Sequence, residues 1–281
     1  MRDTSARVAI VTDSTSDIPL DLAKSLDIVV VPALLMIEDS TFRDGIDLSR
    51  EEFYRRLPNI SKPPSTAVPS PLAFEQVYRE RLDSGYEHLL SIHLSPKLSG
   101  MINVVNQAAE AFGDQVYIYD SQQVSLGLGF QAIEAAHAAM EGLPLEPILE
   151  RLRKIRENVR LIAMIDTQEY LWRSGRVSWL SASLGKMLRM RLLVEVKRGV
   201  IERRGFVRTR GKAVQDLISL ARSWGSLKRL AVLHTAVAEE ARSLADQLRS
   251  QVTTPPLVVD ATTLLGAYVG PAALGFAGLL Q

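Results

Sequence analysis

Up to Asn158 the chain alternates short apolar runs with segments of helical character. A strand, a crossover helix and a second strand in this order form a parallel sheet, because a parallel connection must return across the face of the sheet. The spacing therefore predicts a doubly wound α/β sheet in this half of the chain. The strand-like runs are 8–11, 28–37, 89–94 and 116–119, and the helical segments are 72–81, 100–112, 127–140 and 147–158.

The second half contains a different pattern. Residues 192–196 and 200–202 flank a Lys-Arg-Gly turn that ends at Gly199, which is typical of a β-hairpin. Further strand-like and helical runs surround the hairpin, so we expect an N-terminal α/β domain at 1–158 and a C-terminal α+β domain at 159–281. The surrounding runs are strand-like at 161–165, 230–233 and 257–259 and helical at 212–224 and 237–251.

The composition narrows the classes of function. The chain has no cysteine, which excludes disulfides, thiol catalysis and zinc–thiolate sites. The formal net charge is +1, whereas a nucleic-acid groove requires a basic excess, so we expect no nucleic-acid partner. The apolar run at 8–11 is too short for the core of a signal peptide, and we predict a cytoplasmic protein.

Residues 261–281 carry no charge and are numerous enough to span a bilayer. Several glycines and Pro271 interrupt the segment, and no Lys or Arg flanks it, which is unfavourable for a transmembrane helix. We therefore predict that this segment forms a helix and a buried strand of the protein core, without stable insertion into a membrane.

Four hydroxyl-rich or glycine-rich loops stand where strands are predicted to end. The carboxyl ends of strands are the usual ligand side of an open α/β sheet, so we expect a ligand site at these loops. The loops are 12–17, 63–71, 95–101 and 266–275.

Several short motifs follow one another along nearly the whole chain, and in this order they resemble the DegV family, the fatty-acid-binding proteins that serve bacterial fatty acid kinases. Each motif alone is weak, so the resemblance rests on their collinear order. The motifs are Thr12–Pro19, Phe42–Gly45 with Glu52–Tyr54, Thr66 with Pro69–Pro71, Ser95 with Leu98–Gly100, Asp120–Ser121, Ser174–Val177, Val207–Thr209 and Gly270–Gly275.

The resemblance implies a parallel-sheet domain and an α+β domain with a ligand slot between them. A long-chain fatty acid would lie in the slot, and a separate ATP-binding fatty acid kinase subunit would phosphorylate its carboxylate. The protein would then be a carrier without catalytic residues and without a cofactor other than the bound fatty acid. Burial of about fifteen methylenes contributes on the order of 12 kcal/mol, at roughly 0.8 kcal/mol each, and association costs remove a large part of this.

By match to the family, Thr66 and Ser95 would donate hydrogen bonds to the carboxylate, since a buried carboxylate requires such donors. Ser99 and the Gly100 backbone would shape the same loop, and Arg208 would lie near the head group. Each has a structural alternative, because a threonine supports turns, a serine before a helix caps it, and a strand arginine is often solvated.

The C-terminal loop departs from the family pattern at one polar position. The family carries a histidine two residues before its Gly-Pro pair, and this chain has Tyr268 there. A tyrosine is neutral at pH 7 and donates one hydrogen bond. We predict that Tyr268 donates a hydrogen bond to the ligand carboxylate. The replacement of the family histidine by tyrosine should affect coupling to the kinase more than it affects fatty acid binding.

A rival hypothesis is a hydrolase or phosphotransferase that uses Ser95 or Ser99 in the interdomain cleft. His93 is two residues before Ser95, but the sequence offers no convincing base beside either serine. The histidines lack metal-ligand spacing, and neither a Walker loop nor a Gly-x-Gly-x-x-Gly follows a strand. We therefore predict no metal site. A regulator that senses acyl chains is a third hypothesis.

Overall fold

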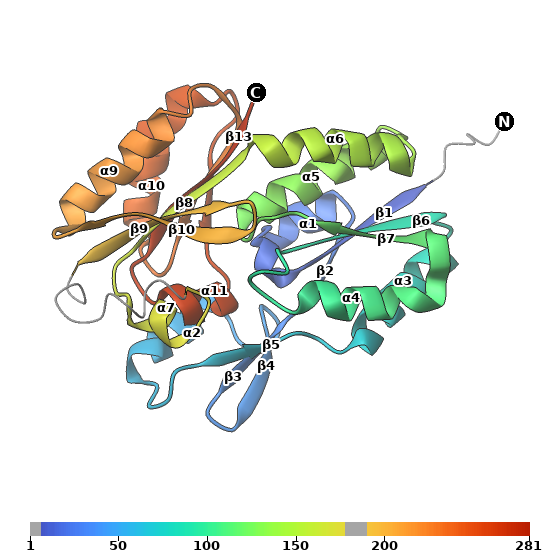
Figure 1. The fold of residues 1–281 in the computed structure, drawn as a ribbon, viewed down its shortest axis with the longest axis horizontal. Helices are drawn as coiled ribbons and strands as arrows, with labels where there is room; N and C mark the ends of the chain where they lie inside the picture. The colour runs from blue at the N-terminus through green and yellow to red at the C-terminus, as the bar shows by residue number, and fades with distance from the viewer. Residues whose placement is uncertain (1–6, 178–189) are drawn as a thin grey trace.

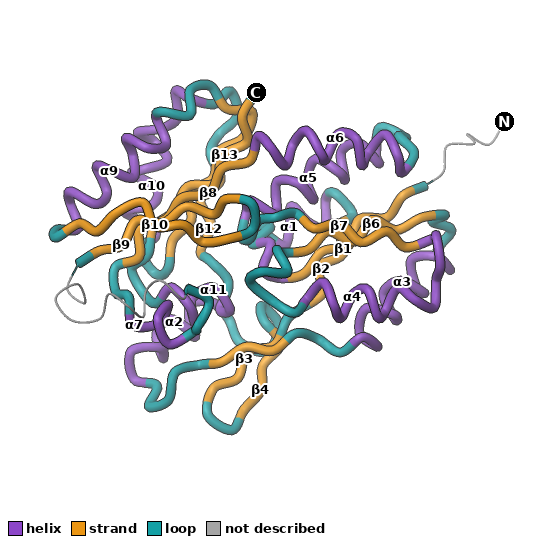
Figure 2. The backbone as a smooth tube through the Cα atoms, viewed as in Figure 1, coloured by secondary structure: helices purple, strands orange, loops and turns teal. Residues whose placement is uncertain are grey.

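The computed structural model describes residues 7–177 and 190–281, which form three sheets (Figures 1 and 2). The N-terminal sheet has the order β2-β1-β6-β7, and all of its pairs are parallel. Two of the polar loops that the sequence placed at strand ends, 12–17 and 95–101, lie where β1 and β6 end, whereas 63–71 contains β5 (Ser65–Ala67) and 266–275 runs from α11 (Thr263–Val269) into β13 (Leu274–Leu280). The strands are β1 (Val8–Asp13), β2 (Ile28–Val31), β6 (His88–His93) and β7 (Val116–Asp120).

Helices cover both faces of the N-terminal sheet, which confirms the doubly wound arrangement. Figure 1 shows α3 and α4 on one face and α5 with α6 on the other. The helices are α1 (Leu20–Ser25), α3 (Pro71–Asp83), α4 (Met101–Ala109), α5 (Leu126–Met140) and α6 (Leu145–Asn158).

The large sheet has the order β10-β9-β8-β13-β11-β12, and only β11 and β12 pair in parallel. Its hairpin of β9 and β10 confirms the predicted one. Helices α9 and α10 pack on the face away from the N-terminal sheet. The elements are β8 (Val159–Ile165), β9 (Arg191–Lys197), β10 (Val200–Val207), α9 (Arg210–Arg222), β11 (Leu227–His234), α10 (Ala238–Leu248), β12 (Leu257–Asp260) and β13 (Leu274–Leu280).

The uncharged C-terminal segment forms α11 (Thr263–Val269) and then β13, the fourth strand of the large sheet. The predicted helix and buried strand are therefore confirmed. In the part of the chain that the structure describes, no helix is both long and apolar enough to cross a membrane.

The strand predicted over 28–37 is wrong, because this run forms two strands in different sheets. Pro32 cannot donate to a ladder, and the chain turns there so that the Ala33 amide donates to Ser14 Oγ at 3.2 Å. The second part joins a small antiparallel sheet of order β4-β3-β5. This sheet consists of β3 (Leu34–Ile37), β4 (Ser40–Arg43) and β5 (Ser65–Ala67), and the short helices α2 (Arg50–Arg56) and α7 (Glu169–Arg173) lie nearby.

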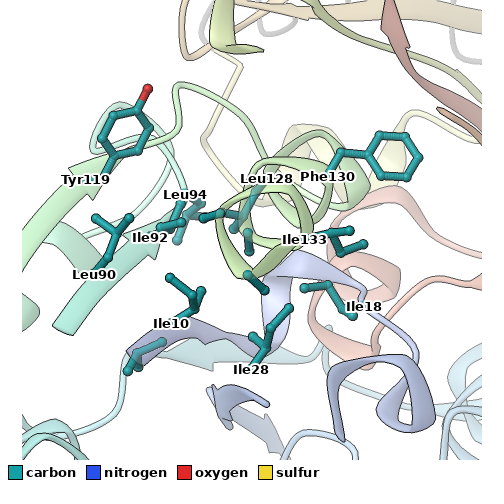
Figure 3. Close-up of a cluster of buried hydrophobic side chains, with 14 of the residues drawn as sticks. Ile10, Ile18, Ile28, Leu90, Ile92, Leu94, Tyr119, Leu128, Phe130 and Ile133 are labelled. Atoms are coloured by element: carbon teal, nitrogen blue, oxygen red, sulfur yellow. The ribbon is translucent and has the colours of Figure 1, made fainter. Parts of the chain in front are cut away.

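One hydrophobic core runs through both main sheets. Helix α5 is buried along almost its whole length and packs against β1 on one side and against β8 and β13 on the other. Figure 3 shows Leu128 and Ile133 of α5 above Ile10 of β1, and the same cluster continues to Leu161 of β8 and Ala277 of β13. The residues before and after position 158, where the sequence predicts a domain boundary, therefore share this core.

A buried carboxylate joins the two halves at the ends of their strands. Asp17 accepts hydrogen bonds from Ser125 Oγ at 2.5 Å and from the Thr262 amide at 2.7 Å, just before α11 begins. Burial raises the pKa of Asp17 to about 6, although the charge of Arg50 and these hydrogen bonds act in the opposite direction. The folded protein therefore holds a proton on Asp17 that the unfolded chain releases near pH 4.

The raised pKa of Asp17 predicts how the unfolding free energy depends on pH. The unfolding free energy of the wild type should fall as pH rises from about 4 to 6, because the folded state binds more protons there. The side-chain amide of Asp17→Asn does not titrate, so this contribution to the pH dependence is absent in the variant. The variant should gain up to about 3 kcal/mol relative to the wild type between pH 4 and 7, measured by urea unfolding. Asp21→Asn, on the exposed face of α1, is the control, and a constant difference for Asp17→Asn would contradict the prediction.

Candidate functional site

A cavity of about 470 Å³ lies between the loops of the N-terminal sheet and the large sheet. We call it the central cavity. Its walls are mainly Ala, Val, Leu and Ile, so it suits an apolar molecule. The N-terminal half contributes Leu94, Leu98, Met101 and Val124, and β8, β9, β11 and β13 contribute Leu161, Ala163, Ile165, Val194, Val196, Leu233 and Gly275.

Polar groups gather where β5 and α11 meet at the cavity. The hydroxyls of Thr66 and Tyr268 are hydrogen-bonded to each other, although 202 positions separate them in the sequence. The guanidinium of Arg176 lies over the Tyr268 ring, 4.9 Å from its centroid. All three residues line the cavity. The arrangement places two hydroxyl groups and one cation around the same point, which we call the mouth.

Ser99 and Gly100 also line the central cavity. Ser99 Oγ accepts a hydrogen bond from the Met101 amide at 3.3 Å, at the start of α4. The serine therefore supports the helix start and borders the cavity at once. The structure brings Thr66, Ser99, Gly100 and Tyr268 together around one space.

Ser95 is fully buried and is not among the described residues that line the cavity. Its Oγ accepts from the Lys97 amide at 3.2 Å and lies against Gly199 in the β9–β10 turn. Gly199 has a positive φ of 78°, and a side chain there would collide with Ser95 Oγ. In this arrangement Ser95 fixes the loop behind the mouth.

Arg208 is exposed at the end of β10 and does not line the cavity, and its carbonyl accepts from Arg191 Nη1 at 3.0 Å. Arg176 is the cation that reaches the mouth. Sequence reasoning included Arg176 in a family motif but assigned it no role. The signal that could have singled it out is its Ser-Gly-Arg turn, which follows α7 and carries a positive φ at Gly175.

A buried hydrogen-bonded chain lies beneath the cavity. Asp13 Oδ2 contacts His93 Nδ1 at 2.7 Å, His93 Nε2 contacts Ser91 Oγ at 2.7 Å, and Ser91 Oγ contacts the Tyr78 hydroxyl at 2.8 Å. Asp13 Oδ1 also accepts from the amide of Thr15 at 2.9 Å and from its hydroxyl. Thr15 lines the cavity, so the chain of bonds begins at the cavity wall.

Burial raises the pKa of Tyr78 well above the usual value, and its hydroxyl is hydrogen-bonded to Ser91. One assignment of the protons gives each group in this chain of bonds a partner: Tyr78 donates to Ser91, Ser91 donates to His93 Nε2, and His93 Nδ1 donates to the Asp13 carboxylate.

This network bears on the rival serine enzyme. The serine that His93 contacts is Ser91, whose hydroxyl is inaccessible and already bonded to Tyr78. Across residues 7–177 and 190–281, neither Ser95 nor Ser99 is hydrogen-bonded to a histidine. The same residues contain no group of three or more His, Asp or Glu that could hold a metal ion.

Comparisons with known proteins agree with one another. A family model described as "Uncharacterised protein, DegV family" matches residues 7–280. A DegV domain-containing protein of Deinococcus radiodurans is 33% identical over 277 residues, covering 96% of this chain and 97% of its own. Protein DegV of Bacillus subtilis is 30% identical over 269 residues, covering 94% of each.

Two solved structures have the same fold along their whole length. A DegV-family protein of Thermus thermophilus, described for its fatty acid binding, is 30% identical with a TM-score of 0.89, covering 98% of this chain and 100% of its own. DegV of Bacillus subtilis, described as a fatty acid binding protein, is 29% identical with a TM-score of 0.88, covering 99% and 100%.

The buried network predicts unequal costs at its two ends. In Asp13→Asn the amide cannot accept all the donors on Asp13, so the unfolding free energy should fall by about 2–4 kcal/mol. Tyr78→Phe removes one hydrogen bond and leaves Ser91 donating to His93, so the loss should be about 1 kcal/mol from that bond. Chemical denaturation measures both, and a smaller loss for Asp13→Asn than for Tyr78→Phe would contradict the bond directions.

Proposed function

The chain belongs to the DegV family, and on that premise we propose that it binds a long-chain fatty acid and carries it to a kinase. The observation that supports the proposal most is the central cavity, which is apolar along its walls and polar at one end. An acyl chain matches the walls, and a carboxylate matches the mouth. Release of apolar surface from water supplies the affinity, less the cost of association.

The mouth has the donors that a carboxylate needs. Thr66 and Tyr268 are bonded to each other in the structure, so one of the two hydroxyl protons lies between them. A carboxylate that enters the mouth can accept both protons, one from each hydroxyl, and replaces one neutral bond with two charge-assisted bonds. Arg176 supplies a positive charge within the same group.

The remaining predicted residues have supporting roles in this proposal. Ser99 and Gly100 border the carboxylate position, whereas Ser95 holds their loop against Gly199. A direct bond from Ser95 or Arg208 to the ligand stays a prediction, and it requires a movement of the loop or of the end of β10. The proposal therefore relies on Thr66, Tyr268 and Arg176.

The carrier role follows from what the mouth presents. The carboxylate would sit beside Arg176, an exposed residue, while the acyl chain stays buried. The sequence has no Walker-type phosphate loop, so a separate kinase subunit would bring ATP to the carboxylate. This partner places the proposed role in the cytoplasm, where ATP is available.

Native mass spectrometry tests binding directly. The wild type, purified without detergent, should carry a ligand with the mass of a long-chain fatty acid. Tyr268→Phe and Thr66→Val should each weaken the affinity for palmitate about tenfold, because each loses one hydrogen bond to a charged acceptor. Tyr117→Phe, an exposed tyrosine on β7, is the matched control. Unchanged affinity in Tyr268→Phe would refute the assignment of the mouth.

A reconstitution separates the carrier from the rival enzyme. The loaded protein, mixed with the ATP-binding fatty acid kinase subunit of its host and ATP, should yield acyl phosphate, and neither protein alone should yield any. If acyl phosphate is absent, the kinase role fails and fatty acid binding remains. Ester hydrolysis by the protein alone, lost in Ser99→Ala, would instead favour the serine enzyme.

A further inference from the structure

The floor of the central cavity is a row of residues that crosses four strands. Val194 of β9 pairs with Ala163 of β8, Ala163 pairs with Gly275 of β13, and Gly275 pairs with Leu233 of β11. All four residues line the cavity. The two central ones are the smallest that a strand can carry, and the outer two are large. The surface of the sheet is therefore hollowed between Val194 and Leu233.

The alternation of side chains along β13 explains why Gly275 faces the cavity. Leu274 and Phe276 pack with the core beneath α9 and α10, although part of Leu274 also borders the cavity. A Cβ placed on Gly275 would lie 3.4 Å from Ala163 Cβ and 3.6 Å from Leu233 Cβ, on their side of the sheet. Because Gly275 has no side chain, it leaves a gap in the floor of the cavity.

Gly278, a second glycine on β13, differs from Gly275 because a neighbouring side chain occupies the space beside it. A Cβ on Gly278 would lie 2.9 Å from the ring of Trp224, so Gly278 makes room for a packed side chain. The nearest atom to a Cβ on Gly275 would be the backbone oxygen of Ile162 at 3.0 Å, followed by the Cβ atoms of Ala163 and Leu233, all within the large sheet itself. None of these atoms comes from a covering element, and the space above Gly275 is the cavity.

The direction of this hollow runs away from the mouth. Arg176, Leu98 and Ile201 line both the central cavity and a second cavity of about 490 Å³ against β10, so the side of the mouth that Arg176 forms lies toward β9 and β10. From β9 to β11 the row crosses three strand spacings of about 4.8 Å, roughly 14 Å in total.

We infer that Ala163 and Gly275 determine acyl chain length, by leaving a trough in the large sheet through which the distal half of a long chain passes. The inference rests on the proposed function, and it names the part of the cavity that selects the ligand. A larger side chain at either position would close the trough while the mouth stayed intact. Chains short enough to end before the trough would still bind.

The test is a comparison of chain lengths in Ala163→Leu. Affinities of the delipidated protein are measured for octanoate and octadecanoate by titration calorimetry. In the variant, octadecanoate should bind at least about tenfold more weakly, since displacement of only two methylenes has that effect. Octanoate should change by less than about threefold. Ala163→Val, with a smaller side chain, should give an intermediate loss and serves if Ala163→Leu does not fold.

Ala67→Leu is the matched control, because it adds the same bulk to the cavity wall beside Thr66. It should weaken both acids by a similar factor. An equal loss for both acids in Ala163→Leu, or no loss, would overturn the inference while leaving fatty acid binding in place. If the wild type binds neither acid, the proposed function itself fails.

Discussion

The site depends on two buried aspartates that hold the start of α11. Asp17 accepts from the Thr262 amide at 2.7 Å, and Asp44 accepts from the amide and hydroxyl of Thr263 at 3.1 and 2.7 Å. The aspartates come from the first fifth of the chain and the threonines from its end. Because α11 is anchored in this way, Tyr268 arrives next to Thr66, and the mouth exists only when the whole chain has folded.

The same end of the chain supplies the floor, so one uncharged segment makes both the polar and the apolar parts of the site. Helix α11 carries Tyr268, and β13 enters the middle of the large sheet between β8 and β11. A central strand needs side chains on both faces to fill its surroundings. Leu274 and Phe276 fill the space toward α9 and α10, whereas Gly275 leaves the space toward the N-terminal sheet unfilled. The cavity is therefore a property of β13 as much as of the polar loops.

Local patterns predicted the elements well, since hydrophobic period and turn residues are local properties. The alternation of apolar runs and helical segments before residue 158 predicted the parallel sheet, and the Lys-Arg-Gly turn predicted the hairpin. The pattern failed at 28–37, because one apolar run can serve two sheets when a proline lies inside it. Thr66 and Tyr268 were named from the sequence, but their direct bond depends on tertiary contacts. Arg176 and Arg208 cannot be ranked by residue type, because only the fold decides which guanidinium reaches the mouth.

In the proposed function, the stacking of Arg176 on Tyr268 would let these two residues bind an anion although Tyr268 stands where the family has a histidine. An arginine over an aromatic face is attracted by the negative face of the ring. A protonated imidazole in the same place would repel the guanidinium. With tyrosine, the charge that complements a carboxylate is Arg176 itself, and the ring beneath it supports its position. In the proposed site the mouth would thus combine the positive charge of Arg176 with a hydroxyl donor, and neither of these two groups is a histidine.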